Sequence, residues 1–497
     1  MMSVVTRPIR VRNAVRFLFR GGEVVLDRFS PRATVLDWLR EEMRAKGTKE
    51  GCAEGDCGAC TVVLARLKAG ALAYEPFNAC ILLLGQLDGA ELITIEDLAK
   101  GGELHPLQRA MVDHHASQCG FCTPGIVMSL FAAYHSGAPQ TYNALCDQLA
   151  GNLCRCTGYR PIIAAALETC NGAAGDRFAA TAGSRAAALA ALADREDVFV
   201  GDEAAFFAAP ASLDSLAALY ARFPDATLVA GATDVGLWIT KQLRDLKRII
   251  WLGRVAGLDG VRPTADNAVS LGATLTLEDA APLLGAIHSD LGELLRRFGS
   301  KQVRASGTVG GNIANGSPIG DLAPALIALG SRVVLRKGAK IRALPLEDFF
   351  IAYGKQDRDP GEFVAAVETP RLAAHQHYRA FKVSKRLDED ISAVMLAVRV
   401  DVDGRRILGA RIGCGGMAAT PKRAASAEQA LIGVSLDKQA SWRAACAALS
   451  QDFAPLTDQR ASAAYRMTVA ANLLEKALLE ISGASTPTRI GMLHAAE

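Results

Sequence analysis

Short apolar segments separated by turn residues fill the first 95 positions, and this pattern predicts a small β-rich unit. Val11–Leu18 and Glu23–Leu26 flank a pair of glycines, so we expect these segments to form a β-hairpin. Ala33–Glu42 has the apolar spacing of a short amphipathic helix, and Thr61–Leu64 is typical of a further strand.

The following segment has the helical period instead. Two apolar stripes begin just after Pro124 and Pro161, and proline is favoured in a first helical turn. Residues 105–115 and 143–149 are also helical in pattern, so we expect four short helices. The stripes consist of Ile126, Val127, Leu130, Phe131 and Tyr134, and of Ile162, Ile163, Ala166 and Leu167.

Residues 171–199 are rich in alanine and glycine and predict a linker, with a loose helix near residues 185–194. Beyond this stretch, Ser212 is placed to cap a helix, and Thr227–Ala230 is a buried strand that leads into a glycine turn. The last part of the chain indicates two strands and a long helix, at Ala393–Asp401, Ile407–Gly413 and Ala461–Ser482.

The size and composition indicate a folded protein of several domains. Its 497 residues are enough for about three to four domains. Because 50% of the residues are hydrophobic and 22% are charged, we expect a large core rather than long disorder. The 55 Lys and Arg residues nearly balance 52 Asp and Glu residues, so charge gives no reason to expect nucleic acid or an anionic membrane as a partner.

Targeting signals are not evident. No apolar run reaches the ~18–20 residues of a membrane span, and the N-terminal residues lack the apolar core of a signal peptide. We therefore expect a cytoplasmic protein. Thiols stay reduced in that compartment, so the 12 cysteines suggest metal ligands or buried thiols rather than disulfides.

The first four cysteines are spaced like the ligands of a plant-type [2Fe–2S] cluster. Three of them lie in one loop with the spacing C-x4-C-x2-C, and the fourth follows at a distance. Gly51, Gly55 and Gly58 relieve steric limits on this loop and let backbone N–H groups approach the sulfurs. Zinc is the alternative, although the spacing and the glycines favour iron–sulfur. The four residues are Cys52, Cys57, Cys60 and Cys80.

A second set of four cysteines lies in the predicted helical segment. Cys119 and Cys122 precede one apolar stripe, and Cys154 and Cys156 precede the other. Helix N-termini would then direct the positive ends of their dipoles toward an anionic thiolate cluster. The spacing alone suits zinc and an iron–sulfur cluster equally well.

The remaining cysteines fit neither spacing, and we expect them to be structural. They are Cys146, Cys170, Cys414 and Cys446. His105, His114 and His115 lie near the cysteines. With eight suitable cysteines present, we expect these histidines to serve helix packing or the surface rather than a metal.

Two glycine-rich segments in the middle of the chain are candidate phosphate-binding loops. Leu228–Gly236 and Ser306–Asp321 offer many backbone N–H groups and hydroxyls, which a diphosphate requires. Flexible surface loops are the alternative. Neither segment contains G-x-G-x-x-G, so a Rossmann nucleotide site is not supported.

The tandem cysteine sets, followed by Leu228–Gly236 and Ser306–Asp321, resemble the iron–sulfur and flavin part of the xanthine dehydrogenase family of molybdenum hydroxylases. The resemblance covers nearly the whole chain and implies an α+β multidomain fold. Its expected parts are a ferredoxin-type β-grasp domain at 8–95, a four-helix [2Fe–2S] domain at 96–170, the linker at 171–199, an α+β FAD-binding domain of the vanillyl-alcohol-oxidase/molybdopterin-dehydrogenase type at 200–375, and a small α+β domain like the CO dehydrogenase flavoprotein C-terminal domain at 376–490.

The resemblance also implies site residues. Both cysteine sets become ligands of [2Fe–2S] clusters, Phe298 lies near the isoalloxazine, and Tyr353 lies near the NAD pocket. Asp234 and Val364 stand where some family members carry Glu and Leu. Without the resemblance, Phe298 is equally typical of a core, and Lys382 of a solvated basic run. The expected FAD contacts are Leu228, Val229, Ala230, Gly231, Ala232, Thr233, Asp234, Val235, Phe298, Thr308, Gly310, Gly311, Asn312, Asp321, Val364 and Lys382.

In function, the resemblance implies an electron-transfer subunit with FAD, two clusters and NAD as acceptor. A larger partner chain would hold the molybdenum cofactor and oxidise a purine, in an (αβ)2 heterotetramer, and no segment here resembles the family's molybdenum domains. We therefore expect no catalytic residue on this chain. The alternatives are the same subunit in an aldehyde or N-heterocycle hydroxylase, a free-standing NADH:acceptor reductase, and a non-enzymatic iron–sulfur scaffold.

Overall fold

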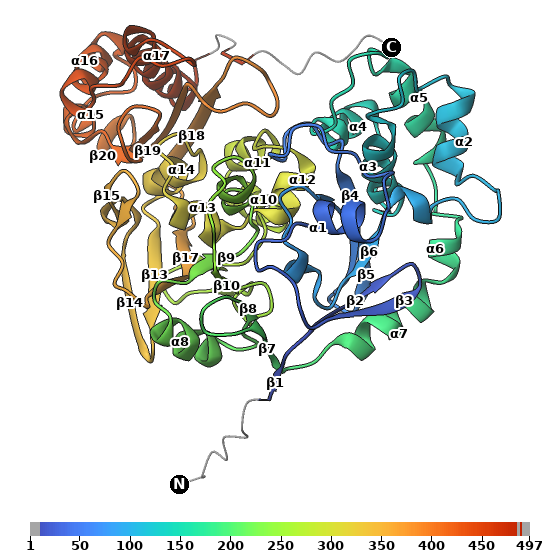
Figure 1. Ribbon diagram of the computed structural model, residues 1–497. Coiled ribbons are helices and arrows are strands. Elements are labelled where there is room, and N and C mark those ends of the chain that lie inside the picture. Colours follow the sequence, from blue (N-terminus) through green and yellow to red (C-terminus); the bar gives the residue numbers. More distant parts are fainter. Residues whose placement is uncertain (1–9, 485–487, 490–497) are drawn as a thin grey trace.

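Five strands near the N-terminus form one mixed sheet in the order β3-β2-β6-β4-β5, drawn in shades of blue in Figure 1. Phe17 and Phe19 on β2 lie edge-on to Trp38, with ring centroids 5.4 and 5.3 Å away, so aromatic rings fill the space beneath the short helix α1. The computed structural model describes residues 10–484, 488 and 489. The elements are β2 (Val15–Phe19), β3 (Gly22–Leu26), α1 (Val35–Asp37) with a π-helical turn at Trp38–Glu42, β4 (Thr61–Lys68), β5 (Ala71–Asn78) and β6 (Glu91–Ile93), with 3-10 turns at Leu84–Leu87 and Ile95–Asp97.

The predicted hairpin is confirmed for β2 and β3, but the expected strand from Val11 to Leu18 is wrong at its start. Val11–Arg12 (β1) instead pairs in parallel with β7 (Asp197–Gly201), at the edge of another sheet. The guanidinium of Arg12 lies 2.8 Å from Asp88 and 3.0 Å from Asp194, and these ion pairs hold it away from the hairpin.

Four helices form the second unit, as predicted. Pro124 and Pro161 both lie in first helical turns. Phe131 of α3 contacts Tyr74 of β5 and Phe178 of the linker, with ring centroids 5.7 and 4.8 Å apart, so the helical unit is packed on both of its neighbours. The helices are α2 (Pro106–Asp113), α3 (Thr123–Tyr134), α4 (Tyr142–Leu149) and α5 (Arg160–Thr169).

The linker is more regular than the loose helix expected there. It contains α6 (Arg177–Ala180) and α7 (Ala182–Leu192), and β7 begins at Asp197 within the same stretch. Asp176 caps α6, and its Oδ2 lies 2.8 Å from His105 Nε2 and 3.0 Å from His135 Nε2. These bonds fix the linker on the helical unit and confirm that His105 serves packing.

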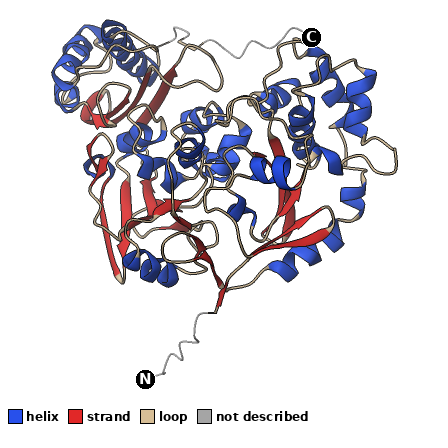
Figure 2. Ribbon diagram, in the orientation of Figure 1, coloured by secondary structure: helices blue, strands red, loops and turns tan. Residues whose placement is uncertain are grey.

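Two sheets and a layer of helices make up the third unit (Figure 2). The first sheet has the order β1-β7-β8-β10-β9, and the second is antiparallel in the order β11-β12-β17-β13-β14. Ser212 caps α8, as predicted. The elements are β8 (Phe206–Ala209), α8 (Leu213–Arg222), β9 (Thr227–Val229), α9 (Val235–Thr240), β10 (Arg248–Trp251), β11 (Val261–Pro263), β12 (Ala268–Gly272), α10 (Leu277–Gly285), α11 (Ser289–Arg296), α12 (Lys301–Ser306), α13 (Val309–Asn315), α14 (Leu322–Leu329), β13 (Arg332–Lys337), β14 (Lys340–Pro345), a 3-10 turn at Leu346–Phe349, the hairpin β15 (Phe350–Ala352) with β16 (Lys355–Gln356), and β17 (Phe363–Pro370).

The last unit is a four-stranded antiparallel sheet covered by helices, drawn in orange and red in Figure 1. Tyr378 is buried and its hydroxyl donates to the carbonyl of Ala325 on α14 at 3.2 Å, which joins this unit to the third. None of the helices in the described part of the chain has the length and apolar character that crossing a membrane requires. The elements are β18 (Gln376–Val383), β19 (Val394–Asp403), β20 (Arg406–Gly415), β21 (Lys422–Arg423), α15 (Ala425–Leu431), a 3-10 turn at Gln439–Trp442, α16 (Arg443–Asp452) and α17 (Ala463–Ser482).

A buried group of two arginines and two aspartates, which we call the ion-pair cluster, joins two of these units and the linker. Asp88 of the first unit binds Arg12 and Arg254, and Asp194 of the linker binds the same two arginines. The side chain of Asp88 has no exposed surface, and each guanidinium is 11% exposed. Four balanced charges thus hold β1, the first unit, the linker and the third unit together.

Candidate functional site

The first cysteine loop is a tightly turned segment between the π-helical turn and β4. Ala53, Gly55 and Gly58 have φ values of 53°, 78° and 68°, so the chain reverses direction repeatedly within the loop. The backbone N–H of Cys57 lies 3.3 Å from the sulfur of Cys52, in agreement with the predicted approach of N–H groups to sulfur.

The four thiols of the first cysteine set contact one another. Cys52 contacts Cys57 and Cys80, and Cys80 also contacts Cys60. The contact with Cys57 holds the pKa of Cys52 well below its usual range. In the described part of the chain, no three His, Cys, Asp or Glu side chains form a group that could hold a single metal ion. The four thiols therefore form one chain of contacts, which runs from Cys57 through Cys52 and Cys80 to Cys60.

The second cysteine set forms two separate contacts and lies nearer the surface. Cys122 contacts Cys154, and Cys119 contacts Cys156. Burial, aided by Cys154, raises the pKa of Cys122 to about 12. Cys119 and Cys156 are exposed, whereas Cys60 and Cys80 of the first set are buried.

The two cysteine loops touch through their backbones. The N–H of Leu153 donates to the carbonyl of Cys57 at 3.0 Å. A Cβ atom on Gly58 would overlap the carbonyl oxygen of Gly151, and one on Gly125 would overlap the carbonyl oxygen of Gly58. Because side chains are absent at these positions, the loops approach more closely than other residues would allow.

The two glycine-rich segments predicted to bind a diphosphate also lie in backbone contact. Gly231 faces the carbonyl of Ser306, where a Cβ atom would overlap it. Thr308 caps α13 and accepts a bond from the N–H of Gly311 at 3.0 Å, and Gly310 packs directly on Ala273. These glycines let the two segments pack closely against each other and against Ala273, because a Cβ atom would not fit at either position.

A charged pair lies buried beside these segments. Lys382 Nζ is 2.7 Å from Oδ2 of Asp321, and each side chain is 4% exposed. Ser392 donates to the other oxygen of Asp321 at 2.5 Å. The alternative in which Lys382 belongs to a solvated basic run is therefore wrong. Asp234, at the start of α9, is half-buried, and burial raises its pKa.

Val364, Phe298 and Tyr353, which are also predicted site residues, lie in separate segments of the third unit. Val364 is buried in β17, Phe298 is half-buried against the core, and Tyr353 is 75% exposed at the tip of the β15–β16 hairpin. Gln356 of this hairpin donates to the carbonyl of Ala314 on α13, which attaches the hairpin to the second glycine-rich segment.

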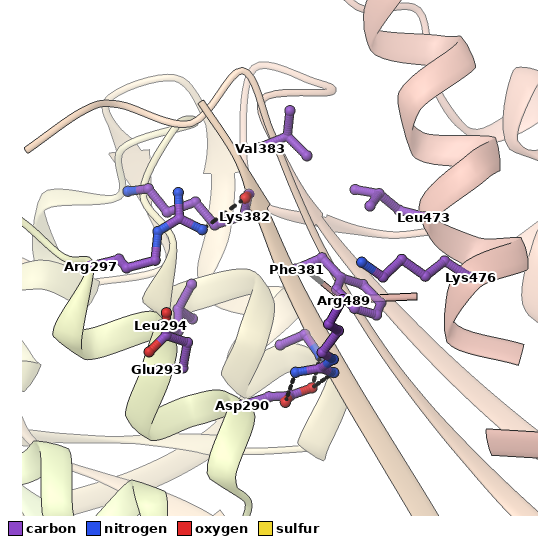
Figure 3. A pocket seen from close by; sticks show the side chains of 11 residues that line it. Asp290, Glu293, Leu294, Arg297, Phe381, Lys382, Val383, Leu473, Lys476 and Arg489 are labelled. Carbon is purple, nitrogen blue, oxygen red and sulfur yellow. Dashed lines mark hydrogen bonds and ion pairs between the residues drawn. The ribbon is translucent and has the colours of Figure 1, made fainter. Parts of the chain in front are cut away.

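Two cavities flank the site. The smaller, of about 180 Å³, lies between α11, β18 and α17, and Figure 3 shows Arg297 bonded to the backbone of Lys382 at its edge. The larger cavity, of about 430 Å³, lies between the first unit and the segment that contains Ala230 and Gly231. Burial lowers the pKa of Arg66 on its wall.

Several residues that support the glycine-rich segments have no recognisable pattern in the sequence. Gln86 Nε2 and Trp251 Nε1 both donate to the carbonyl of Ala230, at 3.0 and 3.1 Å. Neither residue belongs to a spaced motif. A basic residue inside the apolar strand β4, Arg66, was the one visible signal of a buried polar region.

Three protein-family models match the chain and follow its second, third and fourth units. Residues 94–167 match a [2Fe-2S] binding domain, and residues 203–372 match the FAD binding domain in molybdopterin dehydrogenase. Residues 379–481 match the CO dehydrogenase flavoprotein C-terminal domain. The helical unit is therefore an iron–sulfur domain and the third unit a flavin domain.

Individual relatives agree with these matches. A xanthine dehydrogenase from Emericella nidulans is 31% identical over 89% of this chain, and the chain spans 36% of that protein's length. A crystal structure of Cu,Mo-CO dehydrogenase is 26% identical with a TM-score of 0.53, covering 56% of this chain and 97% of its own. Quinoline 2-oxidoreductase from Pseudomonas putida 86, at 24% identity and a TM-score of 0.51, covers 55% of this chain and 95% of its own and shares the fold.

The chain therefore belongs to the molybdenum hydroxylase family and forms an iron–sulfur and FAD part of it. Within that family, two xanthine dehydrogenases match 89% and 94% of the chain.

Proposed function

We propose that this chain is the electron-transfer subunit of a xanthine dehydrogenase, in which two [2Fe–2S] clusters and FAD relay electrons from a partner's molybdenum centre to NAD. The partner would oxidise hypoxanthine and xanthine to urate. Support comes from the 30–31% identity to xanthine dehydrogenases over most of the chain.

The observation that carries this proposal is the row formed by the three predicted cofactor segments. The second cysteine loop bonds to the first through Leu153 and Cys57. The first loop in turn accepts a bond from Lys241, at the end of α9, on the carbonyl of Cys52. Since α9 follows directly on the first glycine-rich segment, these contacts connect the three segments in an order that would suit stepwise electron transfer.

Each group has residues that fit it. Cys119, Cys122, Cys154 and Cys156 would hold one cluster, and Cys52, Cys57, Cys60 and Cys80 the other. Residues 228–235 and 308–312 would hold the FAD diphosphate, with Asp321 and Lys382 beside the flavin. When bound, these groups would supply the electron-carrying chemistry, while the chain would fix their positions. Tyr353 is proposed to line the NAD pocket.

A partner surface is proposed around the second cysteine set. Phe121, Tyr142 and Leu153 are 48%, 48% and 45% exposed near the exposed Cys119 and Cys156. An apolar surface beside a cluster suits docking of the molybdenum-binding chain, with two such pairs forming the (αβ)2 heterotetramer. All twelve cysteines are free of disulfides, which supports a cytoplasmic location.

Steady-state assays test the proposed function. The chain loaded with iron and FAD should oxidise NADH with a dye as acceptor, yet oxidise neither xanthine nor hypoxanthine until the partner is added. Phe298→Ala should slow the NADH–dye reaction more than electron flow from xanthine to a cluster-accepting dye in the complex.

Other outcomes would contradict the proposal. Xanthine turnover by this chain alone would overturn the subunit assignment. A complex active on an aldehyde or an N-heterocycle but inactive on purines would refute the substrate. Failure of fully flavinated protein to oxidise NADH would exclude NAD as the acceptor.

A further inference from the structure

A buried group of amide and hydroxyl side chains lies where the helical unit, the first cysteine loop and the FAD-binding unit meet. Gln302 and Ser129 have no exposed surface, and Asn152 and Thr61 are 1% and 2% exposed. We call these four residues the amide node. They come from segments up to 241 positions apart, so the node exists only in the folded chain.

Gln302 is the central donor of the amide node. Its Nε2 lies 2.9 Å from Oδ1 of Asn152, 3.1 Å from Oγ1 of Thr61 and 3.3 Å from Oγ of Ser129. Thr61 directly follows Cys60, and Ser129 lies on the helix that follows Cys122. One side chain of the FAD-binding unit therefore bonds to both cysteine-bearing units.

Asn152 extends the node into the first cysteine loop. Its Nδ2 donates to the carbonyl of Gly58 at 3.1 Å and to Oγ1 of Thr61 at 3.2 Å. The hydroxyl of Thr61 donates to the same Gly58 carbonyl at 2.7 Å. Because Gly58 adjoins Cys57 and Asn152 lies two residues before Cys154, the node holds the two loops that carry the cysteine sets.

Helix α12 connects the node to the glycine-rich segments. It carries Gln302 and ends at Ser306, whose carbonyl contacts Gly231 of the first segment. Ser306 is also the first residue of the second segment, so α12 leads directly into it. A small tilt of α12 would therefore move both segments relative to the cysteine loops.

Stability alone does not explain a polar cluster here. Apolar residues of the same shape are often as stable as a buried polar network, and Oε1 of Gln302 has no hydrogen-bond partner within the described residues. Hydrogen bonds fix direction as well as distance, which apolar contacts do not. The network is thus suited to fixing the orientation of the two cysteine loops relative to helix α12.

We propose that Gln302 and Asn152 are positioning residues that set the separation and orientation of the two clusters and the flavin segments. This inference rests on the proposed function, because it concerns the rate of transfer between those groups. Neither residue contacts substrate, and both act through the loops that they hold.

Spectroscopy on the iron- and FAD-loaded chain tests the inference. Gln302→Met keeps the length of the side chain and removes the donor, and Asn152→Ala removes the second amide. Gln140→Ala is the matched control, because Gln140 is a buried glutamine of the helical unit whose side chain bonds only within that unit. The readouts are the magnetic interaction between the reduced clusters in electron paramagnetic resonance and the rate of flavin reduction after rapid photoreduction of the clusters.

We expect both node variants to retain iron and FAD, to show altered splitting of the cluster signals, and to reduce the flavin about tenfold or more slowly. The control should match the parent chain. Lower melting temperatures with unchanged splitting and rates in both variants would refute the positioning role. If Gln302→Met fails to fold, Gln302→Asn applies the same test with a shorter amide. A parent chain with only one paramagnetic centre would instead contradict the proposed function itself.

Discussion

At the scale of single residues, the buried pair of Lys382 and Asp321 is the most sensitive point beside the flavin segments. Asp321→Ala would leave the ammonium of Lys382 buried without its partner, which costs about 3–5 kcal/mol. We expect FAD fluorescence to appear at a lower temperature on heating, while iron content stays the same. Asp214→Ala is the control, since Asp214 is 85% exposed. Equal release temperatures for the two variants would contradict the role of the pair.

A second residue gives a pH dependence. Burial, together with the negative charge of Asp56, raises the pKa of Glu389 to about 8, against about 4.3 for glutamate in an unfolded chain. The folded chain therefore holds a proton that the unfolded chain releases, so the free energy of unfolding contributed by Glu389 falls as pH rises from about 4 to about 8.

Glu389→Gln should remove that dependence, because glutamine mimics the protonated acid. We expect the variant to melt above the parent chain at pH 8.5 and together with it near pH 4.5, as measured by circular dichroism. Glu41→Gln, at an exposed position, should follow the parent at both pH values. A parallel pH profile for Glu389→Gln and the parent would show that Glu389 ionises normally.

At the scale of elements, the contact between the two cysteine loops depends on a missing side chain. Gly58→Ala places a methyl group onto the carbonyl of Gly151, in addition to straining a φ of 68°. We expect the loops to separate and iron to fall from about four toward two atoms per chain, the content of one [2Fe–2S] cluster. Iron analysis and visible absorbance measure this loss.

Gly89→Ala is the control that distinguishes backbone strain from steric overlap of the added methyl group. Gly89 has a φ of 72°, yet a Cβ atom there would meet no atom within 4 Å. This variant should keep its iron despite similar backbone strain. If both variants lose iron equally, the backbone angle rather than the loop contact is responsible.

At the scale of the whole molecule, we expect the ion-pair cluster to determine whether the units unfold together. Asp88→Ala leaves Arg12 and Arg254 sharing one carboxylate, and breaking such a buried pair costs about 3–5 kcal/mol. We expect calorimetry to resolve an earlier transition for the first unit. Asp225→Ala, at a carboxylate 67% exposed in its pair with Arg248, should leave the calorimetric profile unchanged.

The features of the fold and of the site that could be predicted from the sequence are those whose pattern lies within one short segment. Spacing alone groups Cys52 with Cys57 and Cys60, and the prolines in the first turns of α3 and α5 mark helix starts. The glycine-rich segments were recognisable because binding backbone to phosphate requires several glycines in one stretch. The four-helix unit and the final α+β unit followed from apolar spacing.

The parts that sequence did not predict depend on single residues brought together from distant segments. Gln302 and Asn152 are 150 positions apart, and neither belongs to a repeating pattern. Arg12 was assigned to a hairpin because its partners, Asp88 and Asp194, lie far along the chain. Such contacts arise from packing of whole units, which periodicity does not describe.

The backbone contact between the cysteine loops also bears on the order in which the protein is assembled. Cys60 and Cys80 are buried, and the helical unit closes over their loop at Gly58. In the proposed subunit, iron and sulfide would therefore have to reach these thiols before the helical unit docks. Cys119 and Cys156 remain exposed afterwards, so the second set can be filled, or repaired after oxidative damage, in the finished fold. The cluster of the buried first cysteine set would thus be inserted first, and the cluster of the exposed second set would be inserted last.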